Sequence, residues 1–469
     1  MTKAMVGMIG LGTMGRNLVL NMADHDISVC GYDKDTAQQK RLSDENNRKV
    51  TVASSIGEFM ENLELPRKII LLVPAGKIVD YVISDLKPLL TKDDILIDGG
   101  NSHFTDTDRR YADLQVMGVH FMGMGVSGGE KGARYGPSMM PGSNKESYEV
   151  MRPILEKIAA QADGKACVQF IGNGAAGHYT KMVHNGIEYA MMQMISEVYG
   201  LLKAAGMSND QLHDFFVECN ASHLQGYLVE ITADVFLKED ELTNNRLVDM
   251  ILDKAGQKGT GMWTSQSALD LLVPITIIDS AVSMRYISSF KEERVKLAGE
   301  YQTHVHDLEV DLENIKHVCK EVLYLGFILC YAQGLHLLQV ASNKYTYEVH
   351  IAHVLEVWKG GCIIRSALLN HFQQAYQEEP NLMNPIASPH FVHEISDRID
   401  VIKIFLKICL EVNISSPAIS AAYQYITSYT TGRLPSNLIQ AQRDYFGAHT
   451  YERLDQAGIF HSEWELSHS

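Results

Sequence analysis

MVGMIGLGTMGRNLVLNMAD, residues 5–24, decides the fold of the N-terminal part of this chain. An apolar run suited to a buried strand ends at Ile9, and Gly10-Leu-Gly12-Thr-Met-Gly15 follows it directly and opens a helix. In this context the three glycines permit a tight turn, a close approach of the backbone to a pyrophosphate, and close packing of the helix on the strand. The turn therefore predicts a dinucleotide site at a helix N-terminus.

Short apolar runs alternate with helix-like segments up to about residue 175, and most of these runs are continuous. Continuous apolar runs are typical of strands that are buried on both faces of a parallel sheet. We therefore predict a doubly wound α/β domain of the Rossmann type over residues 1–177. The expected strands are Met5–Ile9, Ile27–Tyr32, Lys68–Val73, Ile95–Asp98, Val119–Gly123 and Cys167–Ile171.

The pattern changes after about Gly177. Long segments with a period near 3.6 and few β-branched clusters predict a large all-helical domain over residues 178–433. The last part, residues 434–469, is polar and begins with a Leu-Pro pair. It predicts a C-terminal tail that is either disordered or held by a neighbour.

Composition describes an ordinary globular protein: 469 residues, 46% of them hydrophobic and 21% charged. The net charge of −16 argues against nucleic acid as a partner. We expect no membrane-spanning run, because the best candidate, residues 401–412, is short and interrupted by charges. Seven cysteines without a CxxC pair argue for reduced thiols in a cytoplasmic protein and against a zinc site.

HYTKMVHNGIEYAMMQMISE, residues 178–197, holds a candidate acid/base site. The commoner interpretation of such charges is a surface helix with one Lys–Glu pair. Gly186 argues against it, because a glycine costs about 1 kcal/mol in a helix interior; we expect a ligand, or the Ser-Gly-Gly turn at 127–129, to press on this backbone. A helix places four polar groups along one side, at i, i+3, i+4 and i+7: Lys181, His184, Asn185 and Glu188.

The second predicted strand ends at an acidic residue, Asp33, about 20 residues after the glycine turn. A carboxylate at this place accepts hydrogen bonds from the ribose hydroxyls and repels a 2′-phosphate, which favours NAD. Lys34 could instead meet a phosphate, whereas Asp35 again favours NAD.

Six long segments resemble the decarboxylating 6-phosphogluconate dehydrogenases of the pentose phosphate pathway, and they run from the first domain to the tail. The resemblance implies a Rossmann-type domain, a large helical domain that forms a dimer interface, and a tail that inserts into the partner subunit. The segments are IDGGNSHFTDTDRR (97–110), GVSGGEKGARYGPSMMPG (125–142), KMVHNGIEYA (181–190), AGQKGTGMWT (255–264), WKGGCIIRS (358–366) and LIQAQRDYFGAHTYER (438–453).

The same resemblance implies an activity: 6-phospho-D-gluconate is oxidised at C3 and then decarboxylated to ribulose 5-phosphate, without a metal ion. Lys181 would be the base that takes the C3 hydroxyl proton, and Glu188 the acid that protonates C1 of the enediol. A lysine can act as a base near neutral pH only where burial or nearby cations lower its pKa.

The implied substrate contacts include a cationic cluster, which a phosphate needs inside an acidic protein. That cluster consists of Lys258, Arg285 and Arg443. The remaining contacts are Asn101, Ser127, Gly128, Gly129, His184, Asn185, Tyr189, Thr260 and His449, with Arg443 and His449 supplied by the partner's tail.

The implied cofactor is NADP, the default of the family, or NAD. NADP-dependent members often carry Asn-Arg-Thr at the positions of Asp33, Lys34 and Asp35, and a lysine in place of Pro74, so this chain favours NAD or dual use. Met191 and Met262 also depart from the family pattern, and we expect them to alter packing or polarity without abolishing activity. The implied cofactor contacts are Gly10, Gly12, Thr13, Met14, Gly15, Asp33, Lys34, Asp35, Val73 and Asn101.

Two alternatives remain besides this activity. One is a β-hydroxyacid dehydrogenase that acts on another, unphosphorylated sugar acid; the predicted phosphate cluster argues against it. The other is a dinucleotide-binding protein that has lost its catalytic function, and the presence of both Lys181 and Glu188 argues against that.

Overall fold

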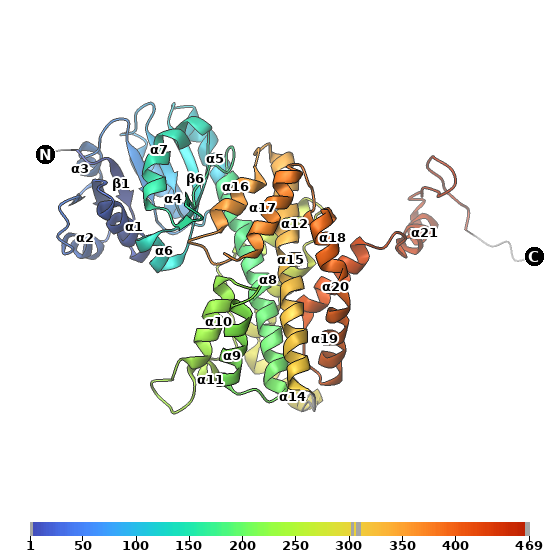
Figure 1. The fold of residues 1–469 in the computed structure, drawn as a ribbon. Helices are drawn as coiled ribbons and strands as arrows, with labels where there is room; N and C mark the ends of the chain where they lie inside the picture. The colour runs from blue at the N-terminus through green and yellow to red at the C-terminus, as the bar shows by residue number, and fades with distance from the viewer. Residues whose placement is uncertain (1–2, 302–303, 306–310, 465–469) are drawn as a thin grey trace, which may run out of the picture. The chain divides into compact units, whose positions relative to one another are not determined.

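A computed structural model describes residues 3–301, 304–305 and 311–464 of the chain. Its N-terminal part is built on a seven-stranded sheet in the order β3-β2-β1-β4-β5-β6-β7, in which the first six strands are parallel and β7 is antiparallel (Figure 1). The chain crosses over between β1 and β4, which is where doubly wound sheets bind their ligands. The strands are Val6–Ile9 (β1), Val29–Tyr32 (β2), Val50–Val52 (β3), Lys68–Leu71 (β4), Ile95–Asp98 (β5), His120–Ser127 (β6) and Ser138–Gly142 (β7).

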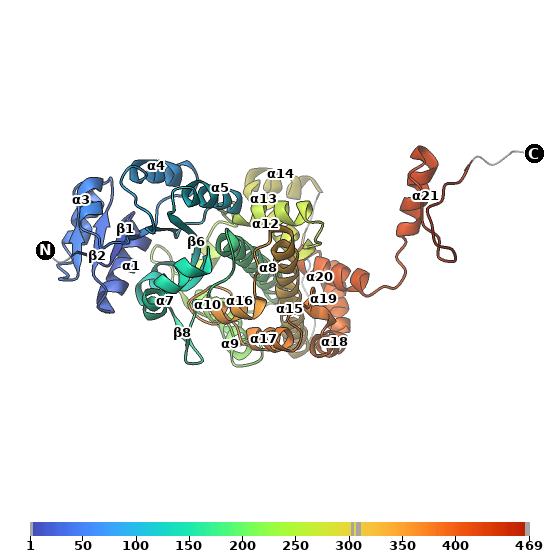
Figure 2. The same ribbon diagram turned by 90° about the horizontal axis from the view of Figure 1, so that it is seen from above.

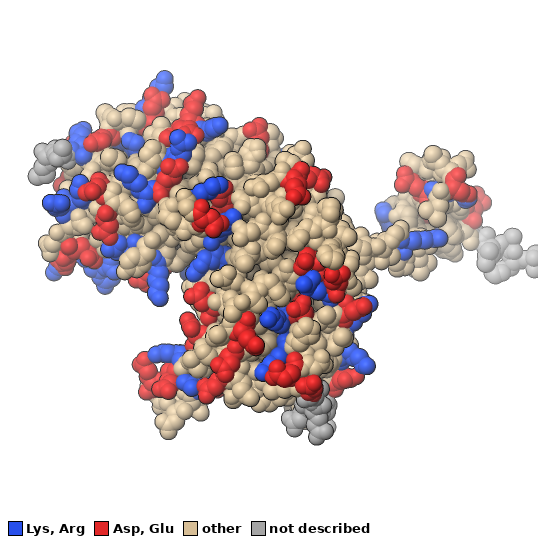
Figure 3. All heavy atoms as spheres, viewed as in Figure 1, with Lys and Arg blue, Asp and Glu red and all other residues tan. Residues whose placement is uncertain are grey.

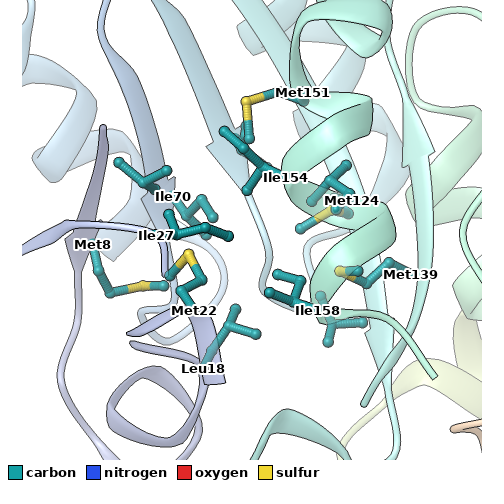
Figure 4. Close-up of a cluster of buried hydrophobic side chains, with 14 of the residues drawn as sticks. Met8, Leu18, Met22, Ile27, Ile70, Met124, Met139, Met151, Ile154 and Ile158 are labelled. Atoms are coloured by element: carbon teal, nitrogen blue, oxygen red, sulfur yellow. The ribbon is translucent and has the colours of Figure 1, made fainter. Parts of the chain in front are cut away.

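Helices cover both faces of this sheet, which confirms the predicted Rossmann-type fold. Leu18 and Met22 of α1 and Ile154 of α7 pack with Met8 and Ile70 on one face (Figure 4). Helices α3, α4 and α5 bury their apolar sides on the other face. The helices are Thr13–Asp24 (α1), Thr36–Ser43 (α2), Ile56–Glu61 (α3), Lys77–Leu86 (α4), Phe104–Gln115 (α5), Gly129–Tyr135 (α6) and Lys145–Ile158 (α7).

Three details of the sheet differ from the sequence prediction. Residues 167–171 do not form a strand, because they meet β7 only through isolated bridges such as that of Met139 with Val168. Strand β3 was not predicted because it has only three residues and lies at an edge of the sheet. Strand β7 was not predicted because it contains Pro141, which a strand tolerates at a sheet edge.

The second part of the chain is helical, as predicted, and is centred on two long helices that pack side by side, α8 and α15 (Figure 2). Together with the sheet it forms one compact unit, residues 1–422. Its helices are Ala176–Ala204 (α8), Asn209–Asn220 (α9), Tyr227–Leu237 (α10), Leu247–Met250 (α11), Thr260–Asp270 (α12), Thr276–Ser289 (α13), Lys291–Tyr301 (α14), Leu312–Tyr345 (α15), Ile351–Trp358 (α16), Leu368–Glu378 (α17), Pro389–Ser396 (α18), Ile399–Glu411 (α19) and Pro417–Tyr429 (α20), with a 3₁₀ turn at Pro385–Ala387.

Helix α15 corrects the expectation that no apolar run reaches membrane-spanning length. Residues 322–343 carry no Asp, Glu, Lys or Arg, and among the described residues α15 is the one helix long and apolar enough to cross a membrane. In the fold, 89% of the most apolar 18-residue stretch of α15 is buried. The run therefore forms the centre of the helical bundle, where α8 and α19 pack against it.

Residues 423–469 form a second compact unit, whose described part ends at residue 464. Besides the last turns of α20, it contains the helix Ser436–Gly447 (α21), which carries the fully buried Asp444. The Asp444 carboxylate accepts hydrogen bonds from the Thr450 and Ser462 amides and from the Trp464 indole. This carboxylate therefore ties Thr450, Ser462 and Trp464 to α21. The domain boundaries after residues 177 and 433 stay predictions.

Charged side chains of both signs are interspersed over the face shown in Figure 3. Among the described residues on that face, Lys and Arg do not gather into the extended basic area that is typical of nucleic-acid-binding proteins.

Candidate active site

Helix α8 lies unusually close to β6 and β7, and glycines make this approach possible. A Cβ on Gly125 of β6 would lie 2.4 Å from Lys181 Cβ, and a Cβ on Gly177 of α8 would lie 2.2 Å from the Met140 carbonyl oxygen. Any larger side chain at either place would push the helix from the sheet. The glycines therefore set the position of Lys181 relative to the end of β6.

We expect Gly125→Ala to lower kcat at least about tenfold, because a misplacement of about 1 Å costs up to 100-fold, and to destabilise the fold by about 1–3 kcal/mol. Gly57→Ala is the matched control, since a Cβ there meets nothing within 4 Å. Thermal unfolding and steady-state kinetics measure both variants. A Gly125→Ala protein with unchanged kcat would contradict this role of the close contact.

The Lys181 side chain lies in a buried polar cluster at the end of β6. Its ammonium donates a hydrogen bond to Ser127 Oγ at 3.1 Å and lies 3.5 Å from His184 Nδ1. Burial lowers the pKa of Lys181, although the nearby Glu188 and Cys362 oppose this shift. A lysine in this environment gives up its proton more readily than one in water, which is what a general base requires.

His184, three residues after Lys181 on α8, is fully buried. Its Nε2 lies 3.4 Å from Ser127 Oγ, and its ring meets Trp358 edge to face at 5.8 Å between centroids. Burial, and then the charge of Lys181, lower its pKa well below the usual value. The surroundings of His184 therefore favour its neutral form, which can both donate and accept a hydrogen bond.

Asn185 connects α8 to the start of α12. Its Oδ1 lies 3.1 Å from His184 Nδ1, and its Nδ2 donates to Thr260 Oγ1 at 3.1 Å. Three predicted substrate contacts are thus joined in one hydrogen-bonded chain.

Glu188 lies one turn further along the same side of α8, with its Oε2 3.9 Å from His184 Nδ1. Burial raises the pKa of Glu188, while Lys181 and Arg285 act in the opposite direction. The same helix side therefore carries a lysine with a lowered pKa and a carboxyl with a raised pKa. Such opposed shifts are typical of a base and an acid in one site.

The reason for Gly186 differs from the one expected. A Cβ at this position would lie 2.8 Å from Thr264 Cγ2, so the glycine makes room for α12 rather than for a ligand or the Ser-Gly-Gly turn. Thr264 Oγ1 also donates to the Met182 carbonyl at 3.0 Å. This contact fixes α12, and with it Thr260, against α8.

The predicted phosphate side is assembled from α8, α13 and the loop before α12. The Arg285 guanidinium stacks on the Tyr189 ring at 3.6 Å from its centroid and donates to the Gly256 carbonyl at 2.6 Å. Lys258 is exposed two residues further along that loop. Arg285 thus holds the loop that carries the second cation.

The Ser-Gly-Gly turn ends β6 and begins α6. Gly128 has φ +114°, and a Cβ there would lie 2.5 Å from the Gly361 carbonyl oxygen. Gly128 is therefore required for packing against the Gly360-Gly361 turn. Gly129 has φ +60° and nothing within 4 Å of its Cβ position, so a ligand can approach its backbone.

A buried arginine positions the loop that carries Asn101, and the sequence analysis did not identify it. Arg110, 2% exposed, binds Asp80 through Nε and Nη2 at 2.8 and 3.1 Å and approaches Asp98 at 3.4 Å. Asp98 in turn accepts from the Gly100 amide and from Ser102 Oγ. The sequence feature that could have pointed to Arg110 is the Arg-Arg pair that ends the segment 97–110.

The glycine turn opens onto a cavity of about 490 Å³ at the carboxyl ends of β1, β2 and β4. The N-terminus of α1 has no side-chain cap and no acidic residue in its first turn, and a Cβ on Gly12 would meet nothing within 4 Å. The space and the free amides fit a pyrophosphate. The predicted contacts that line the cavity are Gly10, Gly12, Asp33, Lys34, Asp35 and Val73.

The other predicted contacts lie elsewhere. Thr13, Met14 and Gly15 form the first turn of α1, and Asn101 is exposed in the loop between β5 and α5. Arg443 and His449 are exposed in the second compact unit. Met191 is buried in α8, whereas Met262 is 36% exposed on α12. Among the described residues, no group of three or more His, Cys, Asp or Glu side chains could hold a metal ion.

Comparisons with known proteins assign the family. Residues 5–172 match the family model described as the NAD binding domain of 6-phosphogluconate dehydrogenase, and residues 177–464 match that of its C-terminal domain.

The NADP(+)-dependent, decarboxylating 6-phosphogluconate dehydrogenase of Bacillus subtilis is 48% identical, over 99% of this chain and 100% of its own length. The decarboxylating enzyme of Escherichia coli is 45% identical, again over 99% and 100% of the two chains. The 6-phosphogluconate dehydrogenase of Plasmodium falciparum, solved in its apo form and with NADP+ or 6-phosphogluconate, superposes with a TM-score of 0.95 at 39% identity, over 98% and 100%. The chain therefore belongs to the 6-phosphogluconate dehydrogenase family.

Proposed function

We propose that this protein oxidises 6-phospho-D-gluconate at C3 and decarboxylates the product to ribulose 5-phosphate. The observation that carries this proposal is the side of α8 on which a buried Lys181 with a lowered pKa and a half-buried Glu188 with a raised pKa flank His184 and Asn185. A bound NAD(P)+ would be the oxidant, because it can take up the hydride that C3 loses. The Gly12 turn and the N-terminus of α1 would hold its pyrophosphate.

In the first step uncharged Lys181 accepts the C3 hydroxyl proton. The resulting ammonium, held by Ser127 Oγ, stabilises negative charge on the C3 oxygen while the C1–C2 bond breaks and CO₂ leaves. Glu188 then donates its proton to C1 of the enediol. The two groups act on neighbouring carbons of the substrate, C3 and the carbon that loses the carboxylate. Their side chains accordingly converge on His184 Nδ1, which lies 3.5 Å from Lys181 Nζ and 3.9 Å from Glu188 Oε2.

The test is incubation of the purified protein with 6-phosphogluconate and either NAD or NADP, followed by the absorbance of the reduced cofactor. Reduction and stoichiometric CO₂ release are expected. Unphosphorylated gluconate is the comparison, because Arg285 and Lys258 have no phosphate to bind in it. Equal kcat/KM for the two acids would favour a dehydrogenase of another sugar acid, and no reduction with any acid would favour a non-catalytic protein.

We also propose a cytoplasmic homodimer in which each tail completes the partner's site. None of the seven cysteines forms a disulfide, as is typical of a protein in a reducing compartment. They are Cys30, Cys167, Cys219, Cys319, Cys330, Cys362 and Cys409. Helix α14 buries none of its residues within the chain, and Phe290, Val295 and Tyr301 are more than half exposed. Such an apolar surface is typical of an interface between protein chains.

Co-expression of two inactive chains tests the tail exchange. A Lys181→Met chain and an Arg443→Ala chain should together form heterodimers with one intact site, which combines Lys181 of one chain with Arg443 of the other. We therefore expect the purified heterodimer to be far more active than either homodimer. Activity no greater than the mean of the homodimers would show that each tail does not serve the partner's site.

A further inference from the structure

The cavity beside the glycine turn is lined in part by a solvent-exposed ion pair. Lys34 follows β2 and Asp85 lies one residue before the end of α4, and Lys34 Nζ donates to Asp85 Oδ2 at 3.0 Å. Both residues line the cavity, and Lys34 is the one basic residue among the described lining residues. The cation that could meet a phosphate therefore already has an anionic partner.

Two further carboxylates stand beside this pair in fixed positions. Asp33 accepts from the Leu11 amide at 2.7 Å and from the Asp35 amide at 2.9 Å. Asp35 caps α2 by accepting from the Ala37 amide at 2.9 Å. Because backbone amides hold both side chains, neither carboxylate can swing away from a ligand without losing its hydrogen bonds.

The charges of this wall disfavour a phosphate. Asp33, Asp35 and Asp85 oppose a single Lys34, and in this fold the end of β2 faces the adenosine ribose. A 2′-phosphate could bind Lys34 only if the Lys34–Asp85 ion pair broke. The Asp85 carboxylate would then lie beside the phosphate dianion without a cationic partner. Like charges placed together disfavour the wrong ligand more strongly than the absence of an attractive contact does.

We propose that Asp85 is a specificity-determining residue, which by engaging Lys34 makes the protein prefer NAD to NADP. The proposal rests on the proposed function only in that the cofactor is a dinucleotide. It also assigns Lys34 to Asp85 rather than to a cofactor phosphate.

Binding of adenosine 2′,5′-bisphosphate and of adenosine 5′-monophosphate, measured by calorimetry, tests the proposal in a double-mutant cycle. Asp85→Asn should tighten the bisphosphate about fivefold, since a phosphate contact to a freed lysine is a charge-assisted bond, and leave the monophosphate unchanged. Lys34→Ala alone should change neither affinity by more than about twofold, as expected for an exposed charge that is already paired. The variant that combines Asp85→Asn with Lys34→Ala should not show the tighter binding of the bisphosphate.

The control is Asp26→Asn, which removes the same charge from the Lys49–Asp26 pair, 3.2 Å long and outside the cavity. The gain in Asp85→Asn should shrink at high salt, because exposed charges are screened. The ratio of kcat/KM for NADP to that for NAD should rise by the same factor.

Two results would overturn the proposal: an Asp85→Asn protein with wild-type affinity for the bisphosphate, or a Lys34→Ala protein that binds it about fivefold more weakly. The first would show that Asp85 does not withhold Lys34 from the phosphate, and the second that Lys34 binds the phosphate even with Asp85 present. Because nucleotide binding is measured without 6-phosphogluconate, a protein that discriminates as proposed but fails to turn over this substrate would contradict the proposed function alone.

Discussion

Lys181→Met should lower kcat by about 100- to 10,000-fold, the range that a positioned general base contributes. Methionine keeps the length and apolar character of the side chain, so the tight contact with Gly125 remains, but it has no group that can accept the C3 hydroxyl proton. Substrate binding should persist, because Arg285, Tyr189 and Thr260 are unchanged. Initial rates give kcat, and calorimetry with 6-phosphogluconate gives the affinity.

Lys203→Met is the matched control for this variant. Lys203 lies in the last turn of the same helix, and its ammonium is 3.8 Å from Asp249, so its loss should leave kcat unchanged. If Lys181→Met retained kcat within a factor of about ten, a general base worth at least about 100-fold could not reside in this lysine.

Glu188→Gln should lower kcat about 100-fold through loss of the acid, while hydride transfer in the first turnover stays fast. Rapid mixing should then show a burst of reduced cofactor, followed by slow formation of ribulose 5-phosphate. An unchanged steady-state rate would remove Glu188 from the acid role. Glu218→Gln, an exposed glutamate of α9, controls for the change in charge.

The pH dependence separates the same two groups. Burial raises the pKa of Glu188, so its protonated form persists to higher pH than that of an ordinary glutamate and is lost as pH rises through the raised pKa. Burial lowers the pKa of Lys181, so the neutral amine appears at lower pH than usual. Requirements for both forms give a bell-shaped profile whose apparent pKa values belong to the pair. In Glu188→Gln, kcat should instead rise with pH to a plateau.

Local sequence patterns predicted most of the fold because they report local preferences. The glycine turn after β1, the predicted apolar strands other than 167–171, and the 3.6-residue period of the helical part were confirmed. The same reasoning placed a strand at 167–171 and missed β7, because strand formation there depends on pairing with distant neighbours. The apolar run of α15 was not predicted either, although residues 322–343 carry no Asp, Glu, Lys or Arg.

By itself, the sequence determined the alternating α/β part followed by a helical part, the dinucleotide turn, and the alignment of four polar residues on one side of a helix, because these follow from spacings along the chain. The four residues are Lys181, His184, Asn185 and Glu188. Only the tertiary structure decided what surrounds them. Burial by residues far apart in sequence shifts the pKa values of Lys181 and Glu188. Thr264 packs on Gly186, and Lys34 pairs with Asp85, across similarly long separations in sequence. Desolvation and direct contact depend on distances in space, which no local spacing specifies.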